Sequence, residues 1–267
     1  MRVRKEIVAE NEYHTPGDTP RYLMDRALFN TRFVFMVQFI RVVFKSRSEA
    51  HRCVYDTERW INSSHEIFTH IERCGGKFRI TGLDHIRNST GPVVFLSNHM
   101  STLETMIFPG LIQPLKDVTF VVKDELVRHW AFGAVMRSRN PIVLSRSNPR
   151  EDFQTVMEQG SGILQKGKSI IIFPQSTRRT DFIPSEFNSL GTKLAGRAGA
   201  QVIPVAIKTD FWGNGRITGY LGPVDRSKTI HIAFGEPIPV SGNGKEEHRK
   251  VIAFIEENLS RWNINNP

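Results

Sequence analysis

After Gly75-Gly76, short apolar runs rich in β-branched residues alternate with longer stretches of helical periodicity. The runs predicted to be strands are residues 78–81, 93–96, 119–122, 142–144, 170–173, 202–207 and 229–234. Helical periodicity is found over residues 103–111, 125–136, 151–164, 186–197 and 246–262. This alternation predicts an α/β fold with a central, mostly parallel mixed sheet flanked by helices. In such folds, functional sites lie beyond the carboxyl ends of the strands.

Residues 1–74 are predicted to form a helical, membrane-associating segment, and residues 75–267 an α/β catalytic domain. The run 33–44 is strongly apolar and is flanked by Arg32 and Lys45. As a helix it is about 18 Å long, which is short of the roughly 30 Å hydrocarbon core of a bilayer. Arg41 within the run also opposes crossing. The helix is therefore expected either to lie in the membrane interface or to be buried in the core.

A second helical pattern begins near Val54 and ends at Cys74-Gly75-Gly76. With the first helix it would form a hairpin joined by the polar residues 46–49. His65 and His70 are five positions apart on this helix, which is a poor spacing for chelation. We interpret both as surface residues, and the sequence offers no metal site.

The net charge of +9 favours anionic partners: nucleic acid, anionic lipid head groups or phosphorylated small molecules. We find no nucleic-acid-binding motif and expect no such partner. The two cysteines form no disulfide framework, and residues 1–21 contain no apolar core of a secretory signal.

An imidazole and a carboxylate, His99 and Glu104, directly follow the predicted strand 93–96. Neighbours on one helix face are three or four residues apart, so these two side chains meet only if the chain turns between them. Such a pair can remove a proton from an alcohol at neutral pH. Alternatively, Ser101 and Glu104 form a helix capping box, and His99 is an ordinary surface residue.

Three further predicted strands have residues of functional interest at or near their ends. The predicted strand 170–173 breaks at Pro174 and is followed by Gln175, Ser176, Thr177, Arg178 and Arg179. The strand 142–144 is followed by Ser145-Arg146, and Pro204 interrupts the strand 202–207 at an edge or bulge. Guanidinium groups bind phosphate in a bidentate way, so the arginines at these strand ends could form a phosphate site. Alternatively, they belong to ordinary turns exposed to solvent.

The His99–Glu104 turn, the Arg146 strand end, the loop after strand 170–173 and the Pro204 strand form four blocks in this chain. Their residues and their order in the sequence resemble the glycerolipid acyltransferase family that includes the 1-acylglycerol-3-phosphate acyltransferases of the PlsC type. The matching residues are Asn98, His99 and Glu104; then Arg146; then Phe173, Pro174, Thr177 and Arg178; and last Pro204. The resemblance extends over about residues 78 to 235, and the N-terminal helix pair resembles the membrane-binding motif of the family.

The resemblance implies transfer of a fatty acyl group from acyl-CoA or acyl carrier protein to a lysophospholipid hydroxyl, with no other cofactor. His99 would accept the hydroxyl proton and Glu104 would hold its imidazole. The acceptor phosphate would be held by Arg178, assisted by Thr177 and Arg146, with Arg179 or Lys193 as further candidates. Phe173, Pro174, Gln175 and Ser176 would form the acceptor loop.

Three residues depart from the family pattern. Glu104 replaces the commoner Asp, Gln175 replaces Glu, and Ser176 replaces Gly, which leaves the acceptor identity open. The expected product is phosphatidic acid, made by a monotopic protein at the cytoplasmic face of a membrane. The alternatives are another lysolipid acceptor, a thioesterase, or a lipid-binding protein with a degenerate site.

Overall fold

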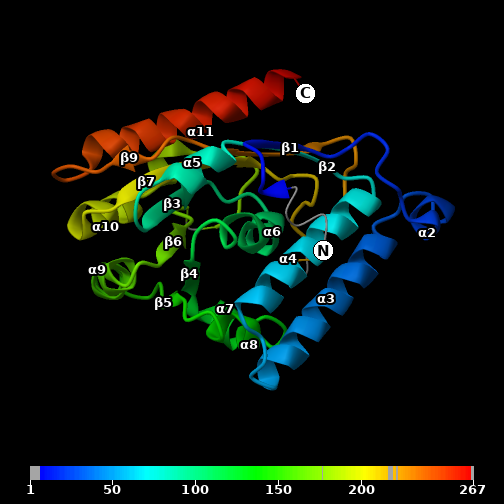
Figure 1. The fold of residues 1–267 in the computed structure, drawn as a ribbon, viewed down its shortest axis with the longest axis horizontal. Coiled ribbons are helices and arrows are strands. Elements are labelled where there is room, and N and C mark those ends of the chain that lie inside the picture. The colour runs from blue at the N-terminus through cyan, green and yellow to red at the C-terminus, as the bar shows by residue number, and fades with distance from the viewer. Residues whose placement is uncertain (1–6, 176, 216–218, 221, 266–267) are drawn as a thin grey trace.

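The strands form one mixed sheet with the order β1-β2-β8-β7-β3-β6-β4-β5, and β9 pairs with β7 (Figure 1). This computed structural model describes residues 7–175, 177–215, 219–220 and 222–265. The strands are β1 (Glu12–His14), β2 (Lys77–Thr81), β3 (Val93–Ser97), β4 (Val118–Lys123), β5 (Ile142–Leu144), β6 (Ser169–Ile172), β7 (Gln201–Lys208), β8 (Thr229–Phe234) and β9 (Ile238–Pro239). The predicted α/β fold with a mostly parallel mixed sheet is confirmed.

Helices cover both faces of the sheet (Figure 1). They are α2 (Leu23–Ala27), α3 (Phe33–His51), α4 (Thr57–Arg73), α5 (Leu83–Asn88), α6 (Leu103–Ile112), α7 (Asp124–Arg128), α8 (Gly133–Arg137), α9 (Pro149–Gln165), α10 (Leu190–Ala198) and α11 (Lys245–Asn265), with a short 3₁₀ turn at Pro184–Glu186. Helix α11 packs against β7, whereas α6 covers the other face and packs in turn against α4.

Strands β5, β4, β6, β3 and β7 are mutually parallel, so their carboxyl ends lie at one edge of the sheet. The residues at or just beyond these ends include Arg146, Lys123, Arg178, His99 and Thr209. Residues far apart in the chain are thus brought to one edge by strand pairing alone.

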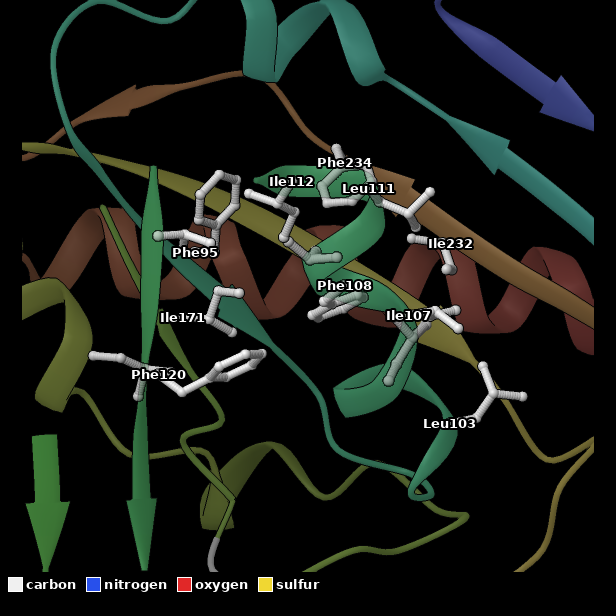
Figure 2. Close-up of a cluster of buried hydrophobic side chains, with 14 of the residues drawn as sticks. Phe95, Leu103, Ile107, Phe108, Leu111, Ile112, Phe120, Ile171, Ile232 and Phe234 are labelled. Atoms are coloured by element: carbon white, nitrogen blue, oxygen red, sulfur yellow. The ribbon is translucent and has the colours of Figure 1, made fainter. Parts of the chain in front are cut away.

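Helix α6 places the loop after β3 because its apolar side is fully buried. Figure 2 shows Phe108, Ile107 and Leu111 directed into a cluster formed with strand residues such as Phe95 and Ile171. Burying a side chain of this size contributes about 1.5–3 kcal/mol. The helix start, and with it the preceding turn, is therefore fixed against the sheet.

Helix α4 packs closely on α6, and this contact corrects our interpretation of His65. His65 is buried, and its Nε2 donates to the carbonyl of Gly110 at 2.7 Å. Ser64 donates to the carbonyl of Ile107 at 3.0 Å and accepts from the N–H of Gly110 at 2.8 Å. The histidine is buried because α6 has unpaired carbonyls near its end that need donors. His70 is half-buried beside the Tyr22 hydroxyl at 2.7 Å.

The predicted joint of the N-terminal hairpin is wrong. Residues 46–49 continue α3 to His51, because polar side chains do not end a helix that lacks Gly and Pro. The chain turns later, where Cys53 adopts a positive φ of 57°. Asp56 then caps α4 by accepting from the N–H of Arg59 at 2.9 Å.

Two other predicted helices are shorter than their periodicity indicated. Residues 125–136 form α7 and α8, separated by a turn in which Nδ1 of His129 accepts from the N–H of Ala131 at 3.2 Å. Helix α10 begins at Leu190, whose N–H is accepted by the Asn188 side chain at 3.0 Å. Local side-chain bonds to the backbone compete with helix formation in both places.

Pro204 lies within β7, at the point where pairing on one side changes from β9 to β8. Residues 201–202 pair with β9, and pairing with β8 begins at Val205. The missing N–H therefore falls at a break in the ladder, while the Pro204 carbonyl accepts from Gly235 at 2.8 Å.

Helix α3 is both a core helix and an exposed apolar helix. Its buried side includes Phe35 and Phe39, whose rings lie 5.0 and 4.8 Å from that of Trp212. Its outer side exposes 62% of Phe33, 40% of Ile40 and 46% of Phe44. Within the described part of the chain, no helix is long and apolar enough to cross a membrane. The domain division at residue 74 stays a prediction.

We predict that Gly110→Ala lowers the free energy of unfolding by about 1–3 kcal/mol, because its Cβ would overlap His65 and Ser64 at the α4–α6 contact. The matched control is Gly162→Ala within α9, where a Cβ would meet nothing within 4 Å. That variant should be neutral or more stable by up to about 1 kcal/mol. Urea denaturation measures both, and equal effects would contradict the close approach of the helices.

Candidate active site

His99 and Glu104 meet through a tight turn between β3 and α6. Nδ1 of His99 lies 2.8 Å from Oε1 of Glu104. The turn begins at Asn98, whose side chain bonds both the N–H and the carbonyl of Ile207 in β7, each at 2.9 Å. The strand end is thereby tied to its neighbour before the chain turns into the helix.

The Glu104 carboxylate is completely buried and accepts five hydrogen bonds. Oε1 also accepts from the N–H groups of Met100 and Ser101, at 2.7 and 2.8 Å. Oε2 accepts from the hydroxyls of Ser101 and Thr209, at 2.9 and 2.8 Å. The pairing of His99 with Glu104 is therefore present, and His99 is not an ordinary surface residue. Of the alternative capping box, only the bond from the Ser101 N–H to the Glu104 carboxylate forms, because the N-cap of α6 is Thr102.

These bonds keep Glu104 ionised. Burial by itself raises the pKa of the Glu104 carboxyl, but the hydrogen bond and charge of His99, together with the Ser101 N–H, outweigh it and lower that pKa below its usual value. A permanent carboxylate on Nδ1 fixes the ring and leaves Nε2 as the nitrogen available for proton transfer.

The loop after β6 holds His99 from behind. The Phe173 ring stacks on the imidazole, with a centroid distance of 4.3 Å. Gln175 is buried, and its Oε1 accepts from the backbone N–H of His99 at 2.7 Å. The N–H of Arg179 donates to the His99 carbonyl at 2.9 Å. This loop thus fixes both backbone polar groups of His99 as well as its ring.

In front of His99 lies a pocket of about 540 Å³. Its polar lining includes His99, Thr102, Lys123, Glu125, His129, Arg146, Thr177, Arg178, Asn214 and Tyr220. Its apolar lining comes from α3, α4, α6, α7, α8 and β4, and includes Val42, Ile67, Met106, Phe120, Leu126 and Val135. A histidine, a cationic group and an apolar groove therefore share one cavity.

The cationic group consists of Lys123, Arg146 and Arg178. Partial burial, followed by the charges of Arg146 and Arg178, lowers the pKa of Lys123, which places the three charges close together. Nη1 of Arg178 donates to the Gly219 carbonyl at 3.1 Å and to the Thr102 hydroxyl, and its guanidinium lies 5.3 Å from the Tyr220 ring centroid. Concentrated positive charge in a partly enclosed pocket attracts anions.

Several residues singled out in the sequence lie elsewhere. Arg179 faces Glu186 at 3.4 Å, and Lys193 lies over the Phe153 ring at 5.8 Å; neither lines the pocket. Pro174 and Gln175 are buried, and Gln175 contacts the His99 backbone. Ser176 falls outside the described residues. Of the residues proposed for phosphate, Thr177, Arg178 and Arg146 line the pocket.

Lys123 was missed by the sequence analysis. It is the last residue of β4, and strand pairing places it opposite Leu144, two residues before Arg146. The signal was present, since a cation at the carboxyl end of a predicted parallel strand is the reasoning that selected Arg146. Within the described ranges, no group of three or more His, Cys, Asp or Glu side chains is arranged to hold a metal ion.

Comparison with known proteins agrees with this geometry. Residues 77–208 match the family model described as Acyltransferase. Over 189 residues the chain is 31% identical to a 1-acyl-sn-glycerol-3-phosphate acyltransferase of Pseudomonas aeruginosa, covering 70% of this chain and 68% of that protein. The chain belongs to the acyltransferase family. The resemblance drawn from the sequence motifs is therefore confirmed.

A more distant relative and a solved structure are also acyltransferases by name. The chloroplastic 1-acyl-sn-glycerol-3-phosphate acyltransferase LPAT1 of Arabidopsis thaliana is 27% identical over 164 residues, which are 61% of this chain and 44% of that protein. The crystal structure of PlsC, the 1-acyl-sn-glycerophosphate acyltransferase of Thermotoga maritima, matches with a TM-score of 0.59 at 19% identity. That match covers 89% of this chain and 91% of the other, and it concerns the fold.

We predict that Glu104→Gln lowers the rate of acyl transfer by about a hundredfold to ten-thousandfold, because the amide keeps the shape but not the charge that orients His99. The control is Thr209→Val, which removes one hydrogen bond to Oε2 and keeps the charge. Its loss should be below about tenfold. Similar rates for Glu104→Gln and Thr209→Val in steady-state assays would show that the carboxylate charge has no role.

Proposed function

We propose that this acyltransferase moves a fatty acyl group from acyl-CoA or acyl carrier protein to the free hydroxyl of 1-acylglycerol-3-phosphate, giving phosphatidic acid. The observation that carries the proposal is the shared pocket, which is lined by His99, a cationic group and an apolar groove. The names of the relatives support the same acceptor.

The proposed reaction is a direct transfer. Nε2 of His99 takes the hydroxyl proton as the acceptor oxygen attacks the thioester carbonyl. The C–S bond then breaks, and the leaving thiolate receives the proton from the imidazolium. Glu104 would stabilise the imidazolium, because its ionised carboxylate lies 2.8 Å from Nδ1.

The cationic group suits the acceptor phosphate. A phosphomonoester carries about −1.5 to −2 charges at pH 7, which exceeds what one arginine can neutralise. Lys123, Arg146 and Arg178 would share it, with the Thr177 hydroxyl as a further donor.

The apolar groove suits a fatty acyl chain. Residues of α3, α4 and α6, among them Val42, Ile67 and Met106, line it together with Phe120 of β4. Each methylene transferred from water into such a groove contributes about 0.8 kcal/mol. The N-terminal helices would therefore supply one wall of the substrate site.

The outer side of α3 suits a membrane surface. Exposed Phe44 lies 5.9 Å from the ring of Trp130, which is itself 64% exposed. Arg41 and Lys45 are exposed on the same helix. Aromatic side chains flanked by cations bind the interface of anionic bilayers. We propose monotopic association at the cytoplasmic face, where anionic lipids attract basic segments.

Purified protein, labelled acyl-CoA and lysophosphatidate test the proposed reaction. Labelled phosphatidate should form, and His99→Gln should abolish it.

We predict that Lys123→Gln raises the KM for lysophosphatidate about tenfold or more through the loss of a charge-assisted contact. The control, Lys193→Gln, lies outside the pocket and should match the wild type. Labelled fatty acid released without dependence on the acceptor would identify a thioesterase instead, and a better rate with another lysolipid would change the acceptor.

Membrane association is tested by flotation with vesicles that contain phosphatidylglycerol. We predict that Phe44→Ser with Trp130→Ser weakens binding about tenfold, because less apolar area enters the interface. Phe153→Ser on α9 is the control, since Phe153 is 40% exposed and lies on another helix. Unchanged flotation of the double variant would contradict the assigned surface.

A further inference from the structure

A second pocket, separate from the His99 site, lies at the tip of the α3–α4 hairpin. Its volume is about 690 Å³. The tip of the hairpin lies beside α8 (Figure 1). The lining residues that matter here are Cys53, Tyr55, Asp56, Arg59, Arg137 and Arg139. The reaction described above uses none of its charged groups.

The charges of this tip pocket are unbalanced. Arg59, Arg137 and Arg139 line it, and Asp56 is the single acid among the lining residues. Asp56 forms only a long ion pair with Arg59, with 3.8 Å between Oδ2 and Nη1. Glu49, just outside, lies 3.9 Å from Nε of Arg59.

Arg59 comes from α4, and Arg137 and Arg139 come from the end of α8 and the turn after it. All three are anchored by backbone carbonyls. Arg59 donates to the Val54 carbonyl, and Arg137 to that of Val127. Arg139 donates to the carbonyl of Tyr55 at 2.9 Å. A guanidinium has five N–H donors, so such contacts orient these groups and leave donors for a ligand.

We propose that the tip pocket binds a phosphate group, either as free phosphate or as the head group of an anionic phospholipid. Three arginines against Asp56 and the nearby Glu49 leave a net charge of about +1, so the pocket favours an anion. Guanidinium groups from α4 and from the end of α8 can contact different oxygens of a tetrahedral anion, whereas a carboxylate has only two oxygens to share among them.

The tip pocket adjoins the substrate groove. Tyr55 lines both cavities, and its hydroxyl bonds that of Ser63 at 2.6 Å on the groove side. Arg139 lies over the rings of Tyr55 and Trp60, at 5.9 and 5.5 Å. A phosphate bound to Arg139 would therefore be one side chain away from the groove wall.

Cys53 supplies a local reporter for the tip pocket. It is exposed and lines this pocket, whereas Cys74, the second of the two cysteines, is buried. Burial also raises the pKa of the Cys74 thiol to about 12, which makes it unreactive toward maleimides. The rate of labelling by a neutral maleimide therefore reports whether Cys53 is covered.

The experiment measures Cys53 labelling in the full chain at constant ionic strength, with chloride, inorganic phosphate, or vesicles with and without phosphatidate. We expect phosphate to slow labelling, and Arg59→Gln with Arg137→Gln to raise the phosphate concentration needed about tenfold. Arg261→Gln, an exposed arginine on α11, is the matched control and should behave like the wild type. Arg178→Gln should also keep the protection, which separates this pocket from the His99 site.

The two phosphate arms identify the source. Protection by free phosphate supports a soluble ligand, and protection only by vesicles that contain phosphatidate supports a lipid head group. The proposal is overturned if neither slows labelling more than chloride or neutral vesicles do. It is also overturned if the double variant is protected as well as the wild type. Because labelling needs no turnover, these results do not depend on the proposed acyl transfer.

Discussion

The ionised carboxylate of Glu104 is the constraint on which the site depends. An unpaired charge in a protein interior costs several kcal/mol, and this one is buried completely. It is stable only because two backbone N–H groups, two hydroxyls and the His99 ring all donate to it. The turn between β3 and α6 is therefore held in one shape, and the imidazole is oriented by the same bonds that stabilise the charge.

The second constraint is the direction of the strands. Five parallel strands end at one edge, and each brings one or more polar residues to it. His99 follows β3, and Thr209, which donates to Glu104, follows β7. Lys123 ends β4, and Arg146 and Arg178 follow β5 and β6. No local interaction is needed to collect these groups. Thr209 also joins the two constraints, because its bond to Glu104 crosses from β7 to the turn after β3.

Much of this could be predicted from the sequence, because strands have short, distinct signals. The runs 93–96 and 170–173 located the two main loops, and the spacing of His99 and Glu104 required the turn that is found. The end of α3 could not be predicted in this way, since polar residues 46–49 read as a loop and yet Ser46 is buried. His65 was misjudged because its partner is a carbonyl of α6, which is a tertiary contact without a local pattern.

Arg179 and Lys193 show a second limit of prediction from sequence. Charge identifies candidates for a phosphate site, but the direction of a side chain depends on packing. Arg179 is next to Arg178 in sequence, and its side chain pairs with Glu186 while its backbone N–H holds His99. Lys123 lies at the right strand end and faces the pocket. Position relative to a parallel strand is thus a better guide than position within a motif.

Gln175, where the family pattern has Glu, lies against the backbone of His99. Gln175 does not line the pocket, and its Oε1 accepts from the His99 N–H at 2.7 Å. A glutamate carboxylate could accept the same bond, but it would place a second buried charge beside the histidine, near a carboxylate that is already ionised. A neutral amide keeps the backbone contact and leaves Glu104 as the carboxylate that sets the charge around the imidazole. The substitution therefore bears on how His99 is held, whereas the phosphate of the proposed acceptor would meet the cations that line the pocket.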